Sequence, residues 1–219
     1  MKSPVAAAVF LALTLLAPPK GAPKDERPTY GESMTLYGGD RIVAYLTLQK
    51  HIQLELKITK QQETAIKTIL NKHGDNHPMK ARLDVKGTPK EQAKKIRAMD
   101  IAEGEELLQT LSGTLSAAQL KRLKQLMAQS HGSMIFELPE ARALLDMSDK
   151  QAKEVASLYD KIRADALRDF KAKKLTAADG QKLEHSLSKG VPPQVRATLT
   201  PDQQKALNDL LGEPYDWPK

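Results

Sequence analysis

The stretch HGDNH, residues 73–77, contains the side chains of this chain best suited to binding a metal ion. His73, Asp75 and His77 lie close together in it, and imidazole and carboxylate groups are common ligands of zinc and nickel. The spacing predicts a metal site if the segment folds so that the three side chains converge.

The same histidines also fit a structural role at the ends of helices. His73 precedes Gly74, and His131 precedes Gly132. A histidine in the last turn of a helix interacts favourably with the helix dipole, and glycine often follows a helix end. We favour this second interpretation, so no metal ion or other cofactor is expected.

Residues typical of catalytic sites form no recognisable motif. The chain has no cysteine, which excludes cysteine nucleophiles, thiolate metal sites and disulfides. It has no Gly-x-Ser-x-Gly, His-Glu-x-x-His or phosphate-binding loop. Glu103, Glu105 and Glu106 are close in sequence, but an acidic run on a helix usually faces solvent. We therefore expect a protein that is not an enzyme.

The composition is that of a folded, helical protein with a mildly basic surface. Hydrophobic residues make up 40% of the chain and charged residues 28%, while aromatic residues reach only 4%, which is low for a sheet. The net charge of +7 comes from 34 basic and 27 acidic residues that are interspersed along the chain. A nucleic-acid site would gather the basic residues into a patch or stripe, so no nucleic-acid partner is expected.

Residues 1–22 have the pattern of an export signal. Lys2 gives the positive start, and residues 5–17 are uncharged, mostly apolar and too short for a comfortable membrane span. We expect a periplasmic or secreted protein with no stable membrane span after the signal is cleaved.

Four segments of the chain begin in the same way, with ITKQQ at Ile58, LSAAQ at Leu115, MSDKQ at Met147 and LTPDQ at Leu199. In each, a Ser or Thr is followed three residues later by Gln, which is the spacing of a capping box. The hydroxyl accepts a hydrogen bond from a backbone N–H of the first turn, and the Gln side chain accepts one from the backbone of the cap residue. The predicted pairs are Thr59–Gln62, Ser116–Gln119, Ser148–Gln151 and Thr200–Gln203.

Apolar residues recur after each of these starts at positions that share one side of a helix. Glycine and proline mark the breaks between the periodic segments. The expected helices cover residues 42–56, 60–73, 90–110, 117–131, 149–174 and 201–211, with a loop at 77–89 and a short helix that begins at Pro139.

These patterns predict an all-α fold without a sheet, built as a tandem duplication of a helical unit of about 85 residues. Residues 23–40 contain proline, glycine and few aliphatic side chains, and are expected to be a flexible linker. The first helical unit is expected at 41–133 and the second at 134–219.

Between the two units, Met134, Ile135 and Phe136 place three large apolar side chains in a row. They are candidates for an exposed patch that binds a partner protein. The alternative, which we favour, is a connecting segment that packs down onto the helices.

The repeated apolar-Ser/Thr-x-x-Gln pattern in an exported helical chain resembles the Spy/CpxP-like family, which is defined by an LTxxQ motif. LTPDQ has the Leu-Thr form, and the other three segments are degenerate versions. The resemblance implies an all-helical periplasmic protein. It also implies stress-response chaperone activity on a basic, partly apolar surface, and related family members sense metals.

On this basis we predict a chaperone-like or stress-associated protein that binds unfolded client proteins or a specific partner protein. The alternative is a metal-responsive sensor or a structural scaffold. Four motifs on one chain, where two would make an ordinary subunit, predict a monomeric pseudo-dimer or a homodimer.

Overall fold

The computed structural model describes residues 28–37, 39–172 and 191–217, and these residues form helices and no strand, which confirms the all-α prediction. The expected export signal at 1–22 lies outside the described residues. No helix among those described is both long and apolar enough to cross a membrane. The helices are α2 (Tyr30–Ser33), α3 (Gly39–Leu48), α4 (Lys50–Glu55), α5 (Lys60–Asn76), α6 (Met79–Leu83), α7 (Pro89–Ser112), α8 (Ala117–Ser130), the 3₁₀ helix η2 (Gly132–Glu137), α9 (Pro139–Leu144), α10 (Asp149–Ala172), α12 (Pro193–Arg196) and α13 (Pro201–Leu211).

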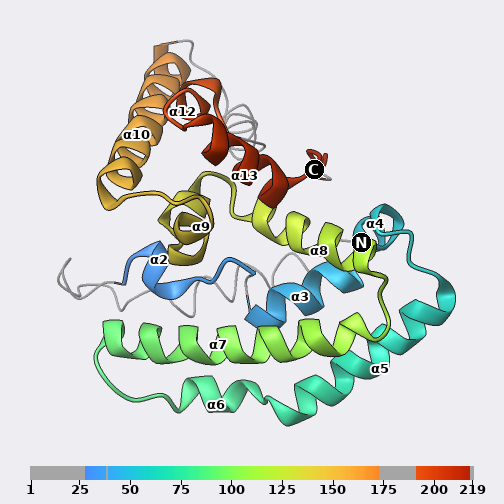
Figure 1. The fold of residues 1–219 in the computed structure, drawn as a ribbon. Helices are drawn as coiled ribbons and strands as arrows, with labels where there is room; N and C mark the ends of the chain where they lie inside the picture. The colour runs from blue at the N-terminus through green and yellow to red at the C-terminus, as the bar shows by residue number, and fades with distance from the viewer. Residues whose placement is uncertain (1–27, 38, 173–190, 218–219) are drawn as a thin grey trace.

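The long helix α7 organises the first part of the molecule (Figure 1). Helices α5 and α6 run along one side of it, while α2 and α3 cover another side. Helix α8 turns back over α3, and α10, α12 and α13 form a separate group beyond α9 (Figure 1). The end of α5 and all of α6 are thereby held against the middle of α7.

Two apolar clusters form the core of the described residues. The first is built from α3, α4, α5, α7 and α8, with Ile66, Leu107 and Leu123 among its fully buried side chains. The second is built from η2, α9, α10, α12 and α13, with Val155 and Leu207 at its centre. The stripes predicted after each helix start supply residues to these clusters, as amphipathic packing requires.

The two clusters are joined at α8 and at the C-terminal segment. Ala128, near the end of α8, belongs to the second cluster, while Tyr215 and Trp217 pack against the first. Gln129 strengthens this junction, because its side chain donates to the carbonyls of Leu211 and Glu213 and accepts from the backbone N–H of Tyr215. Residues on each side of the expected boundary between 133 and 134 therefore pack into the apolar cluster of the other side.

The expected flexible linker at 23–40 is wrong over the residues that the structure describes, 28–37 and 39–40. Leu36 is 1% exposed and belongs to the second apolar cluster, and Asp40 is buried against α5 and α6. Further bonds reach its backbone, because Arg97 Nε donates to the carbonyl of Met34 and His131 Nε2 contacts the carbonyl of Leu36. These contacts anchor a segment whose composition indicated little burial.

The expected helix end at Gly74 and loop at 77–89 also differ from the structure. Helix α5 continues through Gly74 to Asn76, and α6 forms within the expected loop. Gly74 has open space where a side chain would be, so it neither ends the helix nor is required there by packing.

Three of the four predicted helix starts have both bonds of the predicted capping box, and the fourth has one of them. Thr59, Ser116 and Thr200 each cap their helix in a complete capping box with Gln62, Gln119 and Gln203. At the remaining start, the backbone N–H of Gln151 donates to Ser148 Oγ at 3.2 Å. A further capping box, Thr88 with Glu91, begins α7 and was not among the predicted ones.

The capping glutamines also pair with each other across the fold. Gln62 and Gln119 exchange side-chain hydrogen bonds of 2.9 and 3.2 Å, and Gln151 and Gln203 do the same at 2.7 and 2.9 Å. Two helix starts are thus locked together in each half of the chain. The tandem duplication itself stays a prediction, which this matching of contacts favours.

Candidate metal centre

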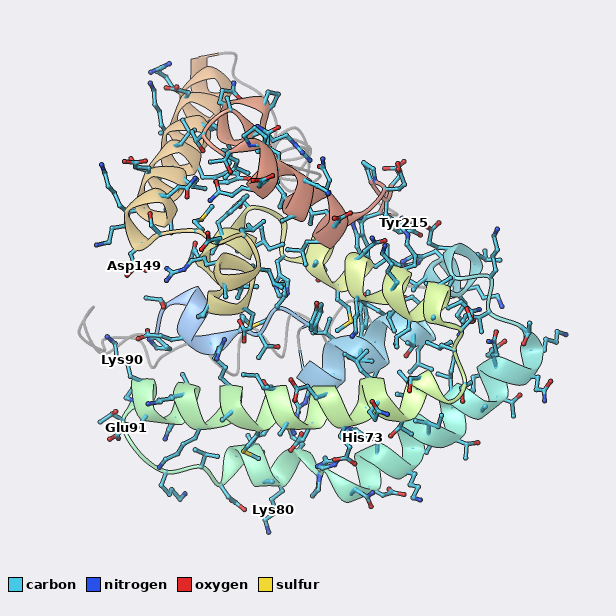
Figure 2. All side chains as sticks on the ribbon, in the orientation of Figure 1. His73, Lys80, Lys90, Glu91, Asp149 and Tyr215 are labelled. Carbon is cyan, nitrogen blue, oxygen red and sulfur yellow. The ribbon has the colours of Figure 1, made fainter. Side chains whose placement is uncertain are left out.

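His73 and His77 lie at the C-terminal end of α5 and face α7. They are four residues apart, so the helix brings both rings to the same side, and their centroids are 4.4 Å apart. Figure 2 shows His73 between α5 and α7. His73 is 7% exposed, whereas His77 is partly open to solvent.

Glu106 on α7 completes a group of three potential metal ligands with these histidines. One ring nitrogen of each histidine and one carboxylate oxygen of Glu106 lie within 4.8 Å of one another. His77 Nε2 is 3.1 Å from Glu106 Oε2. Two imidazoles and a carboxylate are a donor set that zinc and other divalent transition metals accept.

A second carboxylate lies behind each histidine. Asp40 Oδ2 is 3.5 Å from His73 Nε2, and Glu103 Oε1 is 3.4 Å from His77 Nδ1. Carboxylates in this position fix the orientation and tautomer of a ligating imidazole and raise its basicity. Glu103, at Nδ1, therefore supports His77 as the outer carboxylate of a metal ligand does, because the Nε2 of His77 faces Glu106. Asp40 faces the Nε2 of His73 itself and is not a support of this kind.

The buried guanidinium of Arg82, on α6, holds the carboxylates together. Its Nη2 donates to Asp40 Oδ1 at 2.7 Å and to Glu103 Oε2, and lies 2.9 Å from Asp100 Oδ1. Its Nε also donates to Asp100 Oδ1 at 3.0 Å. The charges of Asp40, Asp100 and Glu103 are balanced in part by this one cation, so the group remains anionic overall.

Two glycines bring Asp40 into this group. Gly39 begins α3 with a φ of 67°, which favours glycine, and a side chain there would meet Asp100 at 2.9 Å. A side chain at Gly104 would lie 3.1 Å from the Cα of Gly39. The close approach of these two backbones places the first turn of α3 against α7, and Asp40 with it.

Burial and charge shift the pKa values of this group in directions that fit its structure. Burial alone would lower the pKa of Arg82, but its carboxylate partners raise it above the ordinary value. Burial raises the pKa of Asp100, opposed by Arg82. Burial also lowers the pKa of Arg41, whose charge interacts with the same carboxylates. Burial and neighbouring charge therefore act in opposite directions on Arg82 and Asp100, as expected for a partly buried ion-pair network.

The buried Nε2 of His73 has no hydrogen-bond partner. Buried polar atoms are nearly always satisfied, so such an atom calls for an explanation. Its position among ring nitrogens and carboxylate oxygens suits coordination of a cation.

The structure brings together only part of the sequence-predicted site. His73 and His77 converge, but Asp75 is exposed and is not part of the group. The expectation that the acidic run faces solvent is confirmed for Glu105 and Glu106, which are exposed, and is wrong for Glu103, which is buried against Arg82. From its exposed position Glu106 still contacts His77. Spacing of three residues along α7 from Asp100 to Glu106 was the available signal.

The apolar patch considered at Met134, Ile135 and Phe136 is not formed. Ile135 is fully buried and Phe136 is 3% exposed, with its ring 6.0 Å from that of Tyr159. The segment folds as η2 and packs against α10, as the favoured alternative predicted.

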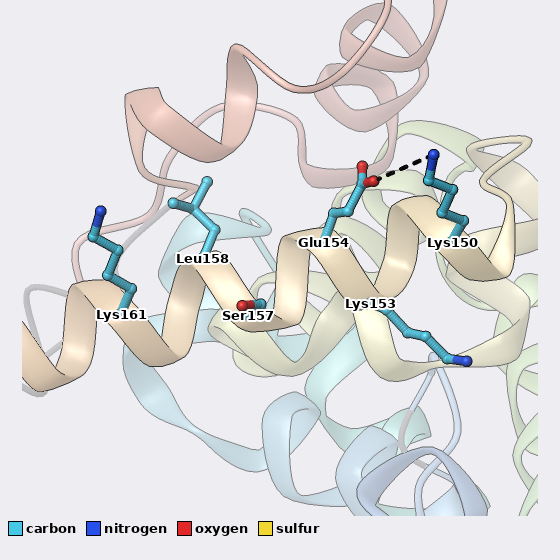
Figure 3. A pocket seen from close by; sticks show the side chains of 6 residues that line it. All are labelled: Lys150, Lys153, Glu154, Ser157, Leu158 and Lys161. Atoms are coloured by element: carbon cyan, nitrogen blue, oxygen red, sulfur yellow. Dashed lines mark ion pairs between the residues drawn. The ribbon is translucent and has the colours of Figure 1, made fainter.

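A hollow of about 530 Å³ lies along α10, but the side chains that line it do not converge as His73, His77 and Glu106 do. Figure 3 shows Lys150, Lys153 and Lys161 spread along one helix, with Lys153 pointing away from the others. The drawn ion pair, Lys150 to Glu154, is 3.9 Å long and exposed. Such a surface is typical of a solvated helix face.

No family model, curated protein or solved structure matches this chain. The resemblance to the Spy/CpxP-like family therefore stays a prediction from the motifs.

Proposed function

We propose that this protein binds one divalent transition-metal ion through His73, His77 and Glu106. The observation that carries the proposal is the convergence of their ligand atoms within 4.8 Å, with one histidine buried and its Nε2 without a hydrogen-bond partner. Nitrogen and oxygen donors favour zinc, nickel or cobalt over calcium or magnesium, which prefer oxygen alone.

Binding at this position would connect α5 to α7. A ligand that binds the folded state stabilises it, and a metal with ligands on two helices would resist their separation. The protein then acts as a metal-responsive helical module. The response is a change in the stability and mobility of the α5–α6–α7 segment.

Calorimetric titration of the metal-free protein with zinc, nickel and cobalt tests this proposal. We expect binding of one ion per chain, and at least a tenfold loss of affinity in His73→Ala, His77→Ala and Glu106→Gln. Asp75→Asn is the matched control, since Asp75 lies in the same HGDNH stretch but outside the group, and should leave affinity unchanged. Absence of binding, or equal affinity in all four variants, would contradict the proposal.

A second candidate function is the holding of unfolded protein, which the family resemblance implies. The observation that favours it is a groove of about 360 Å³ between α8 and α13, with an apolar floor that includes Tyr37, Leu120 and Leu210. Lys121 and Lys124 line the same groove. Such a surface suits an extended apolar segment with acidic flanks.

An aggregation assay with a reduced, unfolded client protein tests this second candidate. Near-stoichiometric protein should slow light scattering, and Leu120→Asp should remove the protection because it places a charge on the groove floor. Leu54→Asp, at an exposed leucine on α4, is the control and should still protect. No protection by the unaltered protein across several clients would exclude this function.

We further propose that either function operates in the periplasm or outside the cell. The support is the export-signal pattern at 1–22. Mass spectrometry of the protein recovered from a fractionated cell would show a shortened N-terminus if this is correct, and full-length cytoplasmic protein if it is not.

A further inference from the structure

The carboxylates around Arg82 have the spacing of a second metal site. One oxygen each from Asp40, Asp100 and Glu103 lie within 4.8 Å of one another, and Arg82 Nη2 contacts all three residues. A nitrogen atom of a guanidinium thus lies where three carboxylate ligands converge.

The geometry at Arg82 is unusual for an arginine ion pair. A guanidinium normally spreads its donors over a carboxylate as a fork with two parallel bonds. Here three acceptors meet at Nη2, which carries only two hydrogens, while the buried Nη1 has no partner. Nε and Nη2 therefore share one guanidinium charge among three carboxylates, whose oxygens converge as the ligands of a metal ion do.

Two carboxylates are shared between this group and the histidine group. Asp40 directs Oδ1 to Arg82 and Oδ2 towards His73, and Glu103 directs Oε2 to Arg82 and Oε1 towards His77. Each carboxylate thus bridges the two groups, with one oxygen at the guanidinium and the other at a histidine of the first group. The two groups form one site with two adjacent positions for a cation.

Charge balance agrees with one metal ion beside one guanidinium. The carboxylates are Asp40, Asp100, Glu103 and Glu106, and the guanidiniums are Arg82 and Arg41, which leaves an excess of about two negative charges when both histidines are neutral. A single divalent ion matches that excess. Without Arg82 the excess rises to about three, and a second cation would be required.

We propose that Arg82 is a built-in cation that occupies the second position of a paired, carboxylate-bridged site and limits the protein to one metal ion. Loss of its charge opens the position among Asp40, Asp100 and Glu103 to a divalent ion that accepts oxygen ligands, such as manganese. The inference rests on the proposed metal-binding function for the first ion, but the second position depends only on the carboxylates and Arg82.

Native mass spectrometry of the full chain with zinc and manganese tests this inference. Unaltered protein and Arg82→Lys should bind one ion, and Arg82→Met, similar in volume but neutral, should bind two. Arg82→Gln is the second neutral variant, used if circular dichroism shows that Arg82→Met is unfolded. One ion in both neutral variants, or two ions in the unaltered protein, would overturn the inference.

A triple variant separates the two proposals. His73→Ala and His77→Ala combined with Arg82→Met should retain one manganese, because its carboxylate ligands remain. If the unaltered protein binds no metal while this triple variant binds manganese, the proposed function fails and the second position stands. If the unaltered protein binds one zinc and the triple variant binds nothing, the second position fails and the proposed function stands.

Discussion

The two pairs of helix starts in this molecule are built alike. Gln62 with Gln119 in the first half, and Gln151 with Gln203 in the second, exchange side-chain hydrogen bonds and each also donates to a backbone carbonyl of the facing segment. In each pair, the first helix start comes two residues after a residue with positive φ, which is Lys57 before Thr59 and Asp146 before Ser148. Both pairs of helices are therefore held at the same point by the same bonds.

The halves differ in what lies between the paired starts. In the first half, α6 and α7 bring Arg82 and Glu103 into a buried charged group, and the exposed Glu106 contacts His77 at its edge. In the second half, α10 presents Lys150 and Lys153 to solvent. The shared bonds set the positions of helices, and the chemistry resides in the segment that is different.

The largest expected effect is the difference in stability between removing a buried ion pair and removing an exposed one. Glu103→Ala leaves a donor of the buried Arg82 guanidinium without its acceptor and should cost about 2–3 kcal/mol of unfolding free energy. Glu154→Ala, which removes an exposed pair on α10, should leave stability unchanged within error. Urea unfolding followed by circular dichroism measures both. A small effect at Glu103 would mean that the site is not dry.

The paired glutamines should contribute equally in the two halves. Gln62→Ala removes half of a cap and the side-chain bonds to Gln119 and the Thr114 carbonyl, and Gln151→Ala removes the side-chain bonds to Gln203 and the Thr198 carbonyl. Each should cost about 1–2 kcal/mol. The double variants Gln62→Ala/Gln119→Ala and Gln151→Ala/Gln203→Ala should cost less than the sum of their single variants, since both partners act together. Unequal coupling energies in the two double-mutant cycles would contradict the structural match.

Substituting glycine for the positive-φ residues that precede α5 and α10 should stabilise the folded protein. Lys57 has a φ of 52° and Asp146 a φ of 47°, a region that costs most side chains about 1–2 kcal/mol. Lys57→Gly should raise stability by about 0.5–1 kcal/mol, and Asp146→Gly by less, because aspartate tolerates this conformation better than lysine. Thermal unfolding would show the order, and a loss at both positions would contradict it.

The smallest expected effect is a pH dependence at the junction of the halves. Burial lowers the pKa of His131, whose Nε2–H donates to the carbonyl of Leu36 at 2.8 Å, with Glu140 nearby as an opposing charge. Below about pH 6.5 the unfolded chain takes up a proton that the folded chain does not, so stability falls as the pH falls. His131→Gln should flatten this dependence between pH 7.5 and 5. An unchanged slope would show that His131 titrates freely in the folded state.

The sequence predicted local features well and the site poorly. The helix starts at Thr59, Ser116 and Thr200 depend on residues three apart, and they formed as expected. The buried position of Glu103 depends on its contact with Arg82, which lies in a segment expected to be a loop. The sequence alone therefore predicted Glu103 to be one charge of a solvent-facing acidic run. Asp40 lay in an expected linker, where nothing nearby indicated a partner.

The amino-acid sequence by itself determined where helices begin and which side of each is apolar, because capping and periodicity act within one or two turns. Only the tertiary structure decided that α3, α5, α6 and α7 meet around Arg82, His73 and His77. The physical reason is that ion pairs and metal sites depend on side chains brought together from separate helices, and backbone packing such as that of Gly39 on Gly104 determines the distances.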